Sequence, residues 1–189
     1  VPQIRATVDH LVPQWFARTS LPLRIWSAAS SSGEEPYSIV IALLEAGWGN
    51  HPIEVRASDA SPHALKKARA GQYRDHSFRA LPPSLKEKYF APEPGGWKLS
   101  PEITQRVTFT PANLLAADEV SEFARSQIIF CRNVFIYFSP HAIRQTLATF
   151  ASRMPRGSHL FVGASESLLR LTTDFELREL GDSFVYVRI

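Results

Sequence analysis

The sequence predicts an α/β fold built on a largely parallel, doubly wound sheet. Strand-like apolar runs alternate with stretches of helical periodicity along most of the chain, an order typical of βαβ architecture. Polar motifs directly follow several of the apolar runs, as expected where a ligand binds at the carboxyl ends of parallel strands. Only residues 73–106 break the alternation, because several prolines and the pair Gly95-Gly96 interrupt them.

Local start and stop signals place the helices. Ser61-Pro62 and Ser139-Pro140 each combine an N-cap residue with proline at the first helical position. Glycine ends two helices, at Gly47 and Gly71. These signals and the apolar spacing predict helices over residues 4–19, 34–46, 61–71 and 139 to about 155.

Short apolar runs place the strands. They are expected at 23–27, 54–58, 107–110, 126–131, 159–163 and 184–189. The last strand follows a Gly181-Asp182 turn and is expected to pair antiparallel with a strand near 176–179. Residues 73–106 are interpreted as a short helix and a small antiparallel ribbon inserted between regular units.

Composition limits the class of protein. The chain has 189 residues, of which 44% are hydrophobic and 21% charged, as in ordinary globular domains. No apolar run approaches the ~18 residues of a membrane span. Cys131 is the only cysteine and the six histidines are scattered, so neither a disulfide nor a metal site is expected. A cytoplasmic, monomeric protein without membrane insertion is expected.

The net charge of +3 is unevenly distributed. Between Lys66 and Arg106 there are nine basic and four acidic residues. Such a basic face favours an acidic partner, although composition alone favours a solvated surface with no partner. Nucleic acid is not expected as a partner, because basic and aromatic residues are not interleaved in the manner of single-strand binders.

The first strand and the turn after it carry the strongest functional signal. Ala28 to Gly33 form a turn of small residues that leads into the helix at Glu34. Such a turn lets the backbone approach a ligand closely. Asp59 ends the next strand, about where a ribose-binding acid stands in nucleotide sites. The regular G-x-G-x-x-G spacing is absent, so a nucleoside ligand of another kind is predicted.

Five ordered blocks resemble the CheR family of chemotaxis receptor methyltransferases. The longest is the run Arg24 to Ser38, which is similar to R-[IV]-W-S-A-[GA]-x-S-[ST]-G-E-E-P-Y-S. The other blocks are Ala57-Ser58-Asp59, Asn113-Leu114-Leu115, Ile129 to Phe138, and Gly163-Ala164-Ser165-Glu166-Ser167. The resemblance extends over nearly the whole chain from about Leu21.

The resemblance implies a Rossmann-like class I fold that binds S-adenosylmethionine (SAM). Its sheet would be seven-stranded and mostly parallel, with helices on both faces and a small inserted β-subdomain at about 73–106. Residues 1–189 would then form one catalytic domain. The implied reaction moves a methyl group from SAM to glutamate side chains of chemotaxis-type receptors, leaving S-adenosylhomocysteine (SAH). In some members the β-subdomain also docks a receptor's C-terminal peptide by strand addition.

Three candidate cofactor residues also have ordinary structural explanations. Asp59 is suited to the two ribose hydroxyls, or it caps the helix at Pro62, a role that Ser61 already fills. Asn113 is suited to an adenine edge, or it is a turn residue. Glu35 would attract the ammonium group of SAM, and Ser32-x-x-Glu35 is at the same time a capping box.

Further residues are assigned mainly by the resemblance. Ala28 and Leu114 would line the adenosyl group, and Asn133 the methionine part of SAM. Arg132 is assigned to both cofactor binding and catalysis, with a structural salt bridge as the alternative. Tyr137 would face the methyl-transfer centre, although its apolar surroundings also suit a core aromatic residue.

Two departures from the family pattern bear on activity. The family often has Gly and Cys where this chain has Ala29 and Ser30, and alanine suits that turn only if its φ is not positive. A T-x-F-F-R motif and a helical receptor-binding domain precede this region in the family, whereas the given sequence begins at Val1. The alternative function is therefore a non-catalytic SAM-binding or receptor-binding module. A third alternative, suggested by the basic pI, is a methyltransferase for a small molecule or RNA.

Overall fold

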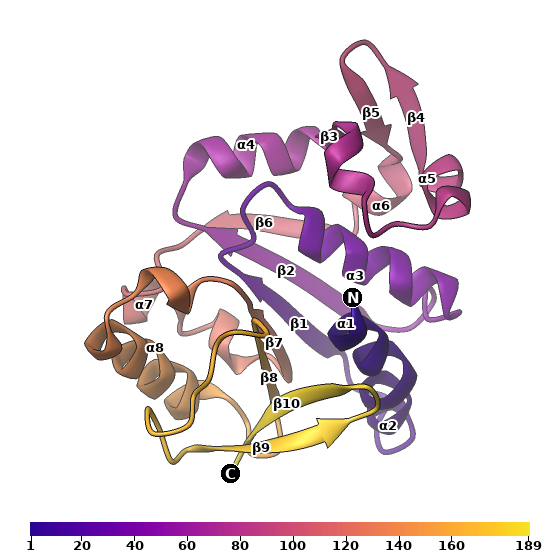
Figure 1. Ribbon diagram of the computed structural model, residues 1–189. Coiled ribbons are helices and arrows are strands. Elements are labelled where there is room, and N and C mark those ends of the chain that lie inside the picture. The colour runs from indigo at the N-terminus through magenta and orange to yellow at the C-terminus, as the bar shows by residue number, and fades with distance from the viewer.

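The computed structural model describes residues 1–189, and its main sheet has seven strands in the order β6-β2-β1-β7-β8-β10-β9 (Figure 1). The pairs that join β6, β2, β1, β7 and β8 are parallel, and β10 and β9 are added antiparallel at one edge. The predicted fold class is confirmed. The strands are β1 Leu23–Ala28, β2 Ile53–Asp59, β6 Val107–Pro111, β7 Ile128–Cys131, β8 His159–Val162, β9 Phe175–Leu180 and β10 Ser183–Arg188.

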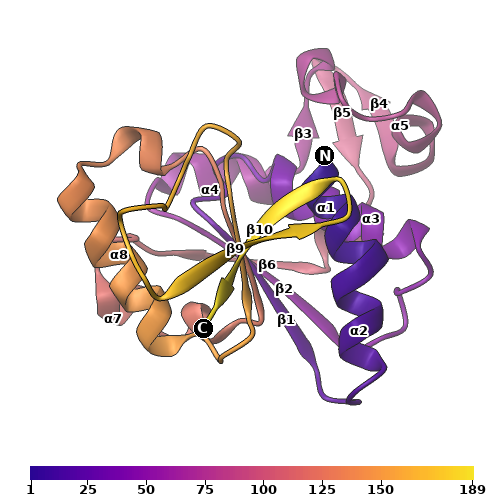
Figure 2. The same ribbon diagram turned by 60° about the horizontal axis from the view of Figure 1, so that its bottom comes forward.

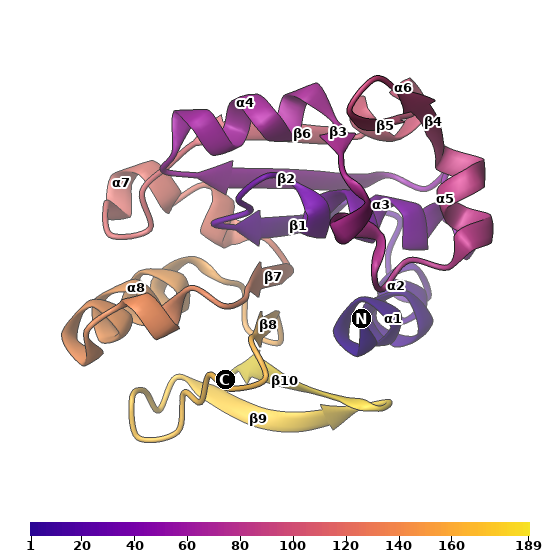
Figure 3. The same ribbon diagram turned by 45° about the horizontal axis from the view of Figure 1, so that its top comes forward.

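Helices cover both faces of this sheet, and each face has its own apolar cluster (Figure 3). One cluster joins Ile4 of α1 and Ile39 of α3 to Ile25 of β1. The other joins Leu147 of α8 to Trp26, the next residue of β1, because successive strand side chains point to opposite faces. The helices and turns are α1 Pro2–Ala6, α2 Val12–Phe16, α3 Glu34–Glu45, α4 Pro62–Ala70, α7 Ala117–Val120, η3 Phe123–Arg125, η4 Phe135–Tyr137 and α8 Pro140–Arg153.

The first helical region is continuous but not uniform. A π-helical turn, η1 Thr7–Leu11, separates α1 from α2. Pro13 lies just after it and has no N–H to give to the helical ladder. A widened turn is one way in which a helix accommodates such a gap. The predicted helical region over about 4–19 is confirmed for most of its length, since the helical run extends from Pro2 to Phe16 and includes this π-helical turn.

The two serine caps are confirmed. Ser61 Oγ accepts a hydrogen bond from the Ala64 amide at the start of α4, and Ser139 Oγ accepts one from the Ala142 amide at the start of α8. Helix α3 begins differently. Its N-cap is Gly33 with φ 90°, and no side chain caps it.

The insertion forms a separate three-stranded sheet in the order β3-β5-β4, standing beside α3 and α4 (Figures 1 and 2). Its apolar side is continuous with the α3 cluster through Tyr73, Phe78 and Tyr89. The inserted antiparallel sheet is as predicted. Its elements are β3 Gln72–Tyr73, η2 Asp75–Phe78, α5 Pro83–Tyr89, β4 Phe90–Glu93, β5 Gly96–Leu99 and α6 Pro101–Thr104.

Candidate functional site

The loops that follow β1, β2, β6 and β7 meet at one edge of the main sheet, because these strands are parallel neighbours. The arrowheads of β1 and β2 point to the same side in Figure 3. Hydrogen bonds tie adjacent loops together. The Ser30 amide donates to the Ser58 carbonyl at 2.8 Å, and the Ala112 amide to the Asp59 carbonyl at 3.2 Å. The structure thus brings the predicted site residues to a common rim.

The turn after β1 has a strained backbone. Ala29 has φ 53°, Ser31 φ 50° and Gly33 φ 90°. The condition that Ala29 avoid positive φ is therefore not met, and alanine occupies a left-handed conformation that glycine adopts at lower cost. The turn is fixed to the next loop, because the Ser31 amide donates to Asp59 Oδ2 at 2.8 Å; its close approach to a ligand stays a prediction.

Glu35 points into the site rather than back along its helix, so the predicted capping box was wrong. Its Oε1 accepts a hydrogen bond from the Ser27 hydroxyl at 2.8 Å, and its Oε2 accepts one from Arg132 Nη1 at 2.9 Å. The two paired side chains are only 18% and 20% exposed. Burial raises the pKa of the Glu35 carboxyl, against the opposing effects of Arg132 and Ser27.

Two polar atoms at this rim are buried without a partner. They are Arg132 Nε, in the loop after β7, and Ser30 Oγ, in the turn after β1. A buried polar group without a partner is costly, so each one in a native structure calls for a physical explanation such as a functional role. The predicted salt bridge of Arg132 is present, and its Nε is the one guanidinium atom that is buried without a partner.

Asp59 stands between two loops. Oδ2 accepts from the Ser31 amide and Oδ1 from the Ser61 amide, each at 2.8 Å. The carboxylate is partly exposed, and an ionised carboxylate has about four acceptor positions. It therefore has capacity for two more donors, such as a pair of vicinal hydroxyls.

Asn113 and Leu114 both have structural roles here. Asn113 Oδ1 accepts from the Leu115 amide at 3.0 Å, which is the turn geometry given above as its alternative explanation. The Asn113 backbone amide donates to Glu119 Oε2 at 2.8 Å. Leu114 is 6% exposed and packs in the α8 cluster. Their contact with an adenine ring stays a prediction, as do the other ligand contacts.

The segment after β7 contains Asn133 and Tyr137. Asn133 has φ 58°, and Tyr137 ends the 3₁₀ turn η4. Tyr137 is 82% exposed, so the alternative that it is a core aromatic was wrong. Cys131 is fully buried, as predicted for a small apolar residue, and burial raises the pKa of its thiol.

The sequence argument gave Glu166 no role, although it quoted the block that contains it. The structure places this carboxylate at the same rim, where it accepts hydrogen bonds from backbone amides of two loops. A glutamate four residues after the end of a buried strand, in a run of small residues, is the signal that could have marked it. No cluster of histidine, cysteine and acidic side chains suited to a metal ion is present. None of the helices is long and apolar enough to cross a bilayer.

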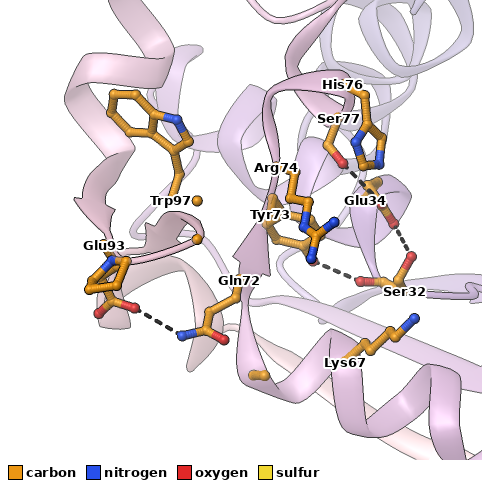
Figure 4. A pocket seen from close by; sticks show the side chains of 14 residues that line it. Ser32, Glu34, Lys67, Gln72, Tyr73, Arg74, His76, Ser77, Glu93 and Trp97 are labelled. Atoms are coloured by element: carbon orange, nitrogen blue, oxygen red, sulfur yellow. Dashed lines mark hydrogen bonds between the residues drawn. The ribbon is translucent and has the colours of Figure 1, made fainter.

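A large cavity, of about 580 Å³, borders the turn after β1 at Ser32 (Figure 4). Its walls come from the turn before α3, the end of α4 and the insertion. The insertion is fastened to the turn here, because the Tyr73 hydroxyl donates to the Ser32 carbonyl at 2.8 Å.

The seven-stranded, mostly parallel sheet has the class I methyltransferase fold, and solved structures share it. An O-methyltransferase family protein from Burkholderia thailandensis superposes with a TM-score of 0.55 at 15% identity, covering 99% of this chain and 55% of that one. A TehB-like SAM-dependent methyltransferase from Corynebacterium glutamicum gives 0.53 at 13% identity, covering 97% and 85%.

Residues 3–183 match the family model described as CheR methyltransferase, SAM binding domain. The chain belongs to this family, as its motifs predicted. The chemotaxis protein methyltransferase of Vibrio parahaemolyticus is 39% identical over 94% of this chain and 66% of its own length. Chemotaxis protein methyltransferase 1 of Pseudomonas aeruginosa is 37% identical over 87% of this chain and 62% of its own. The chain spans less than two thirds of these curated relatives.

Proposed function

We propose that this chain binds SAM and transfers its methyl group to glutamate side chains of chemotaxis-type receptors, forming glutamyl methyl esters and SAH. The observation that carries the proposal is the Glu35–Arg132 ion pair at the rim, in which one hydrogen-bond donor of Arg132 has no partner. Its two members are largely buried, and Arg132 Nε has no partner. Family membership and the names of the relatives support the same activity. Residues 1–189 would act as one catalytic domain with the insertion as its subdomain.

The residues at the rim suit the parts of SAM. Asp59 has two acceptor positions left for ribose hydroxyls, since its present bonds use one position on each oxygen. Glu35 offers a negative charge to the ammonium group, and the free Nε of Arg132 offers a donor to the carboxylate of the methionine part. Ala28, Asn113 and Leu114 would border the adenosyl group, with Asn133 beside the methionine part.

The reaction requires little from the protein beyond alignment. Bound SAM supplies a methyl group that its sulfonium already activates. A glutamate side chain with a pKa near ~4.3 is ionised at neutral pH, so no general base is needed. The site has to hold the acceptor carboxylate in line with the methyl group and keep water away. The site fits this chemistry with Arg132 as its cation and without a proton shuttle.

Arg132 and Tyr137 would act on the acceptor. The Arg132 guanidinium can steady the glutamate carboxylate until the charges of cation and anion cancel. Tyr137, 82% exposed, extends from the rim to where an incoming helix would lie. Because the Tyr137 side chain contacts solvent in the protein alone, the receptor helix itself would have to exclude water from the reacting atoms.

A receptor segment of acidic character suits the insertion. Lys67 and Arg74 line the large cavity, and neither side chain makes an ion pair or hydrogen bond (Figure 4). Other basic residues of this region are already engaged, such as Lys86 with Asp75 and Lys88 with Glu45. An acidic C-terminal peptide would meet the free cations. Receptor fragments with and without such a peptide test this, and equal affinities for this protein would contradict it.

The activity is tested with the protein in its native length and a receptor fragment that carries glutamate-rich helices. The measurement is the transfer of labelled methyl groups from SAM into base-labile esters. Arg132→Ala should lower the rate about 100-fold, since it removes the cation at the reacting atoms. Arg56→Ala is the matched control, because Arg56 pairs with Glu54 on the surface. Equal rates in the two variants would remove Arg132 from the reaction.

A non-catalytic module is the second candidate. It is favoured by one observation, the engagement of the Arg132 guanidinium by Glu35. In that case SAM would bind with measurable heat while no ester forms on any receptor fragment. Methyl esters formed by the wild-type protein would exclude this alternative.

A further inference from the structure

We propose that Glu166 is the positioning residue that holds the Asn133–Tyr137 segment in its working conformation. The proposal rests on the proposed function, because it assigns to that segment a part in cofactor and acceptor binding. Glu166 lies outside the segment, in the loop after β8, and need not touch either ligand. Its effect would pass through the backbone of the loop after β7.

The Glu166 carboxylate accepts hydrogen bonds only from backbone amides. Oε2 accepts from Asn133 at 2.8 Å and from Gly163 at 2.6 Å, and Oε1 accepts from Ile136 at 3.3 Å. Glu166 is 9% exposed and forms no ion pair. Three amides around one buried carboxylate form charge-assisted bonds, which are stronger than neutral ones. The carboxylate therefore clamps two rim loops together.

The clamp acts where the backbone needs support. Asn133 has φ 58°, a left-handed conformation that asparagine tolerates better than most residues with a side chain but less easily than glycine. Ile136 lies in the 3₁₀ turn η4, which ends at Tyr137. Gly163 completes the arrangement, because a Cβ there would collide with Asn133 Oδ1 and lie 2.8 Å from Glu166 Oε2. Only glycine lets the two loops come this close.

The side chains carried by the segment have no anchors of their own. Asn133 and Tyr137 are both exposed. The only hydrogen bonds that either residue makes run through the backbone, from Asn133 to Glu166 and from the Tyr137 amide to the Val134 carbonyl. Their positions therefore follow from the backbone, which is held by the Glu166 carboxylate together with the buried side chains of Val134 and Phe135.

The test uses Glu166→Gln with Tyr186→Phe as its matched control. An amide in place of the carboxylate loses the charge and turns its NH₂ group toward at least one backbone N–H. Tyr186 is also buried, and its hydroxyl accepts from the Leu168 amide of the same loop at 3.0 Å. Tyr186→Phe removes an acceptor from this loop but leaves the Asn133 and Ile136 amides bound.

Two readouts separate positioning from simple loss of stability. Hydrogen exchange, followed residue by residue in the protein without ligand, should accelerate at Asn133 and Ile136 in Glu166→Gln but not in Tyr186→Phe. With the receptor fragment, kcat should fall about 10- to 100-fold in Glu166→Gln, because small misplacements of reacting groups have effects of that size. KM for SAM should rise by a smaller factor than kcat falls, because Asn133 is only one of the residues assigned to SAM and the loops of Glu35 and Asp59 are untouched.

Unchanged exchange at Asn133 and Ile136, or an equal loss of kcat in Tyr186→Phe, would overturn the proposal. If Glu166→Gln does not fold, Glu166→Asp replaces it, with the charge kept but withdrawn by one methylene group, and the same pattern is expected. If the wild-type protein forms no esters, the proposed function has failed. The exchange measurement still decides whether Glu166 holds the segment.

Discussion

Replacement of Asp59 separates its structural role from its proposed role in ligand binding. In the structure the carboxylate accepts from the Ser31 and Ser61 amides, each at 2.8 Å. Hydrogen bonds to a charged group contribute about 1.5–3 kcal/mol each, and partial exposure places these two near the lower limit. Asp59→Ala should therefore lower the free energy of unfolding by about 2–3 kcal/mol. Asp59→Asn retains one acceptor oxygen and should lose about half as much.

Ligand affinity is the second measurement on the same variants. If Asp59 also binds the ribose hydroxyls, each variant loses charged hydrogen bonds to the ligand. The Kd for SAM and SAH should then rise about 10- to 100-fold, equivalent to about 1.4–2.8 kcal/mol. Titration calorimetry gives the Kd, and urea unfolding gives the stability. Asp182→Ala, an exposed residue of the β9–β10 turn, is the control.

The two measurements together decide whether Asp59 binds the ribose, stabilises the two loops, or does both. A fall in stability with unchanged Kd would refute the ribose role and leave Asp59 as a loop residue alone. The opposite result, a raised Kd with unchanged stability, would refute the energy assigned to the two backbone bonds.

Two further outcomes are expected for stability. Burial and, to a lesser degree, Arg178 lower the pKa of His159 from 6.5 to about 4. Between these pH values the unfolded chain binds a proton at His159 and the folded chain does not. The free energy of unfolding should therefore fall by about 3 kcal/mol as pH drops from 6.5 to 4. Denaturant unfolding across this pH range should show that the free energy of unfolding depends less on pH in His159→Gln than in the wild-type protein, whereas the exposed control His63→Gln should match the wild type. The same pH dependence in His159→Gln and the wild-type protein would contradict the lowered pKa of His159. Ala29→Gly should raise the free energy of unfolding by about 0.5–1 kcal/mol, because φ is 53° at this position; a loss of stability would show that the partly buried Ala29 methyl group contributes more than the strain costs.

Much of the fold was predictable because its signals are local. Ser61 and Ser139 cap their helices through bonds that span three residues, and such bonds form wherever the local sequence allows. The alternation of strands and helices also follows from the pattern of side chains along the chain. Cys131 was correctly placed in the interior for the same reason, since it ends an unbroken apolar run.

The site itself depended on contacts between distant residues. Glu35 had a local partner available in the capping box, yet it binds Arg132, 97 positions away. Gly33 at the N-cap, with φ 90°, leaves that helix start without a side-chain cap. Glu35 binds the distant partner because β1 packs beside β7. The sequence of neither segment alone shows that the two strands are neighbours.

By itself, then, the sequence determined the α/β class, the serine caps, the inserted ribbon and the family, because each rests on periodicity or on contiguous motifs. Only the tertiary structure decided that Tyr137 projects into solvent and that Glu166 clamps a neighbouring loop. In the apolar run after Asn133, Val134 and Phe135 are buried, and only in the 3₁₀ turn η4 do Ile136 and Tyr137 become exposed. The partners of a buried carboxylate depend on which loops the sheet order brings together.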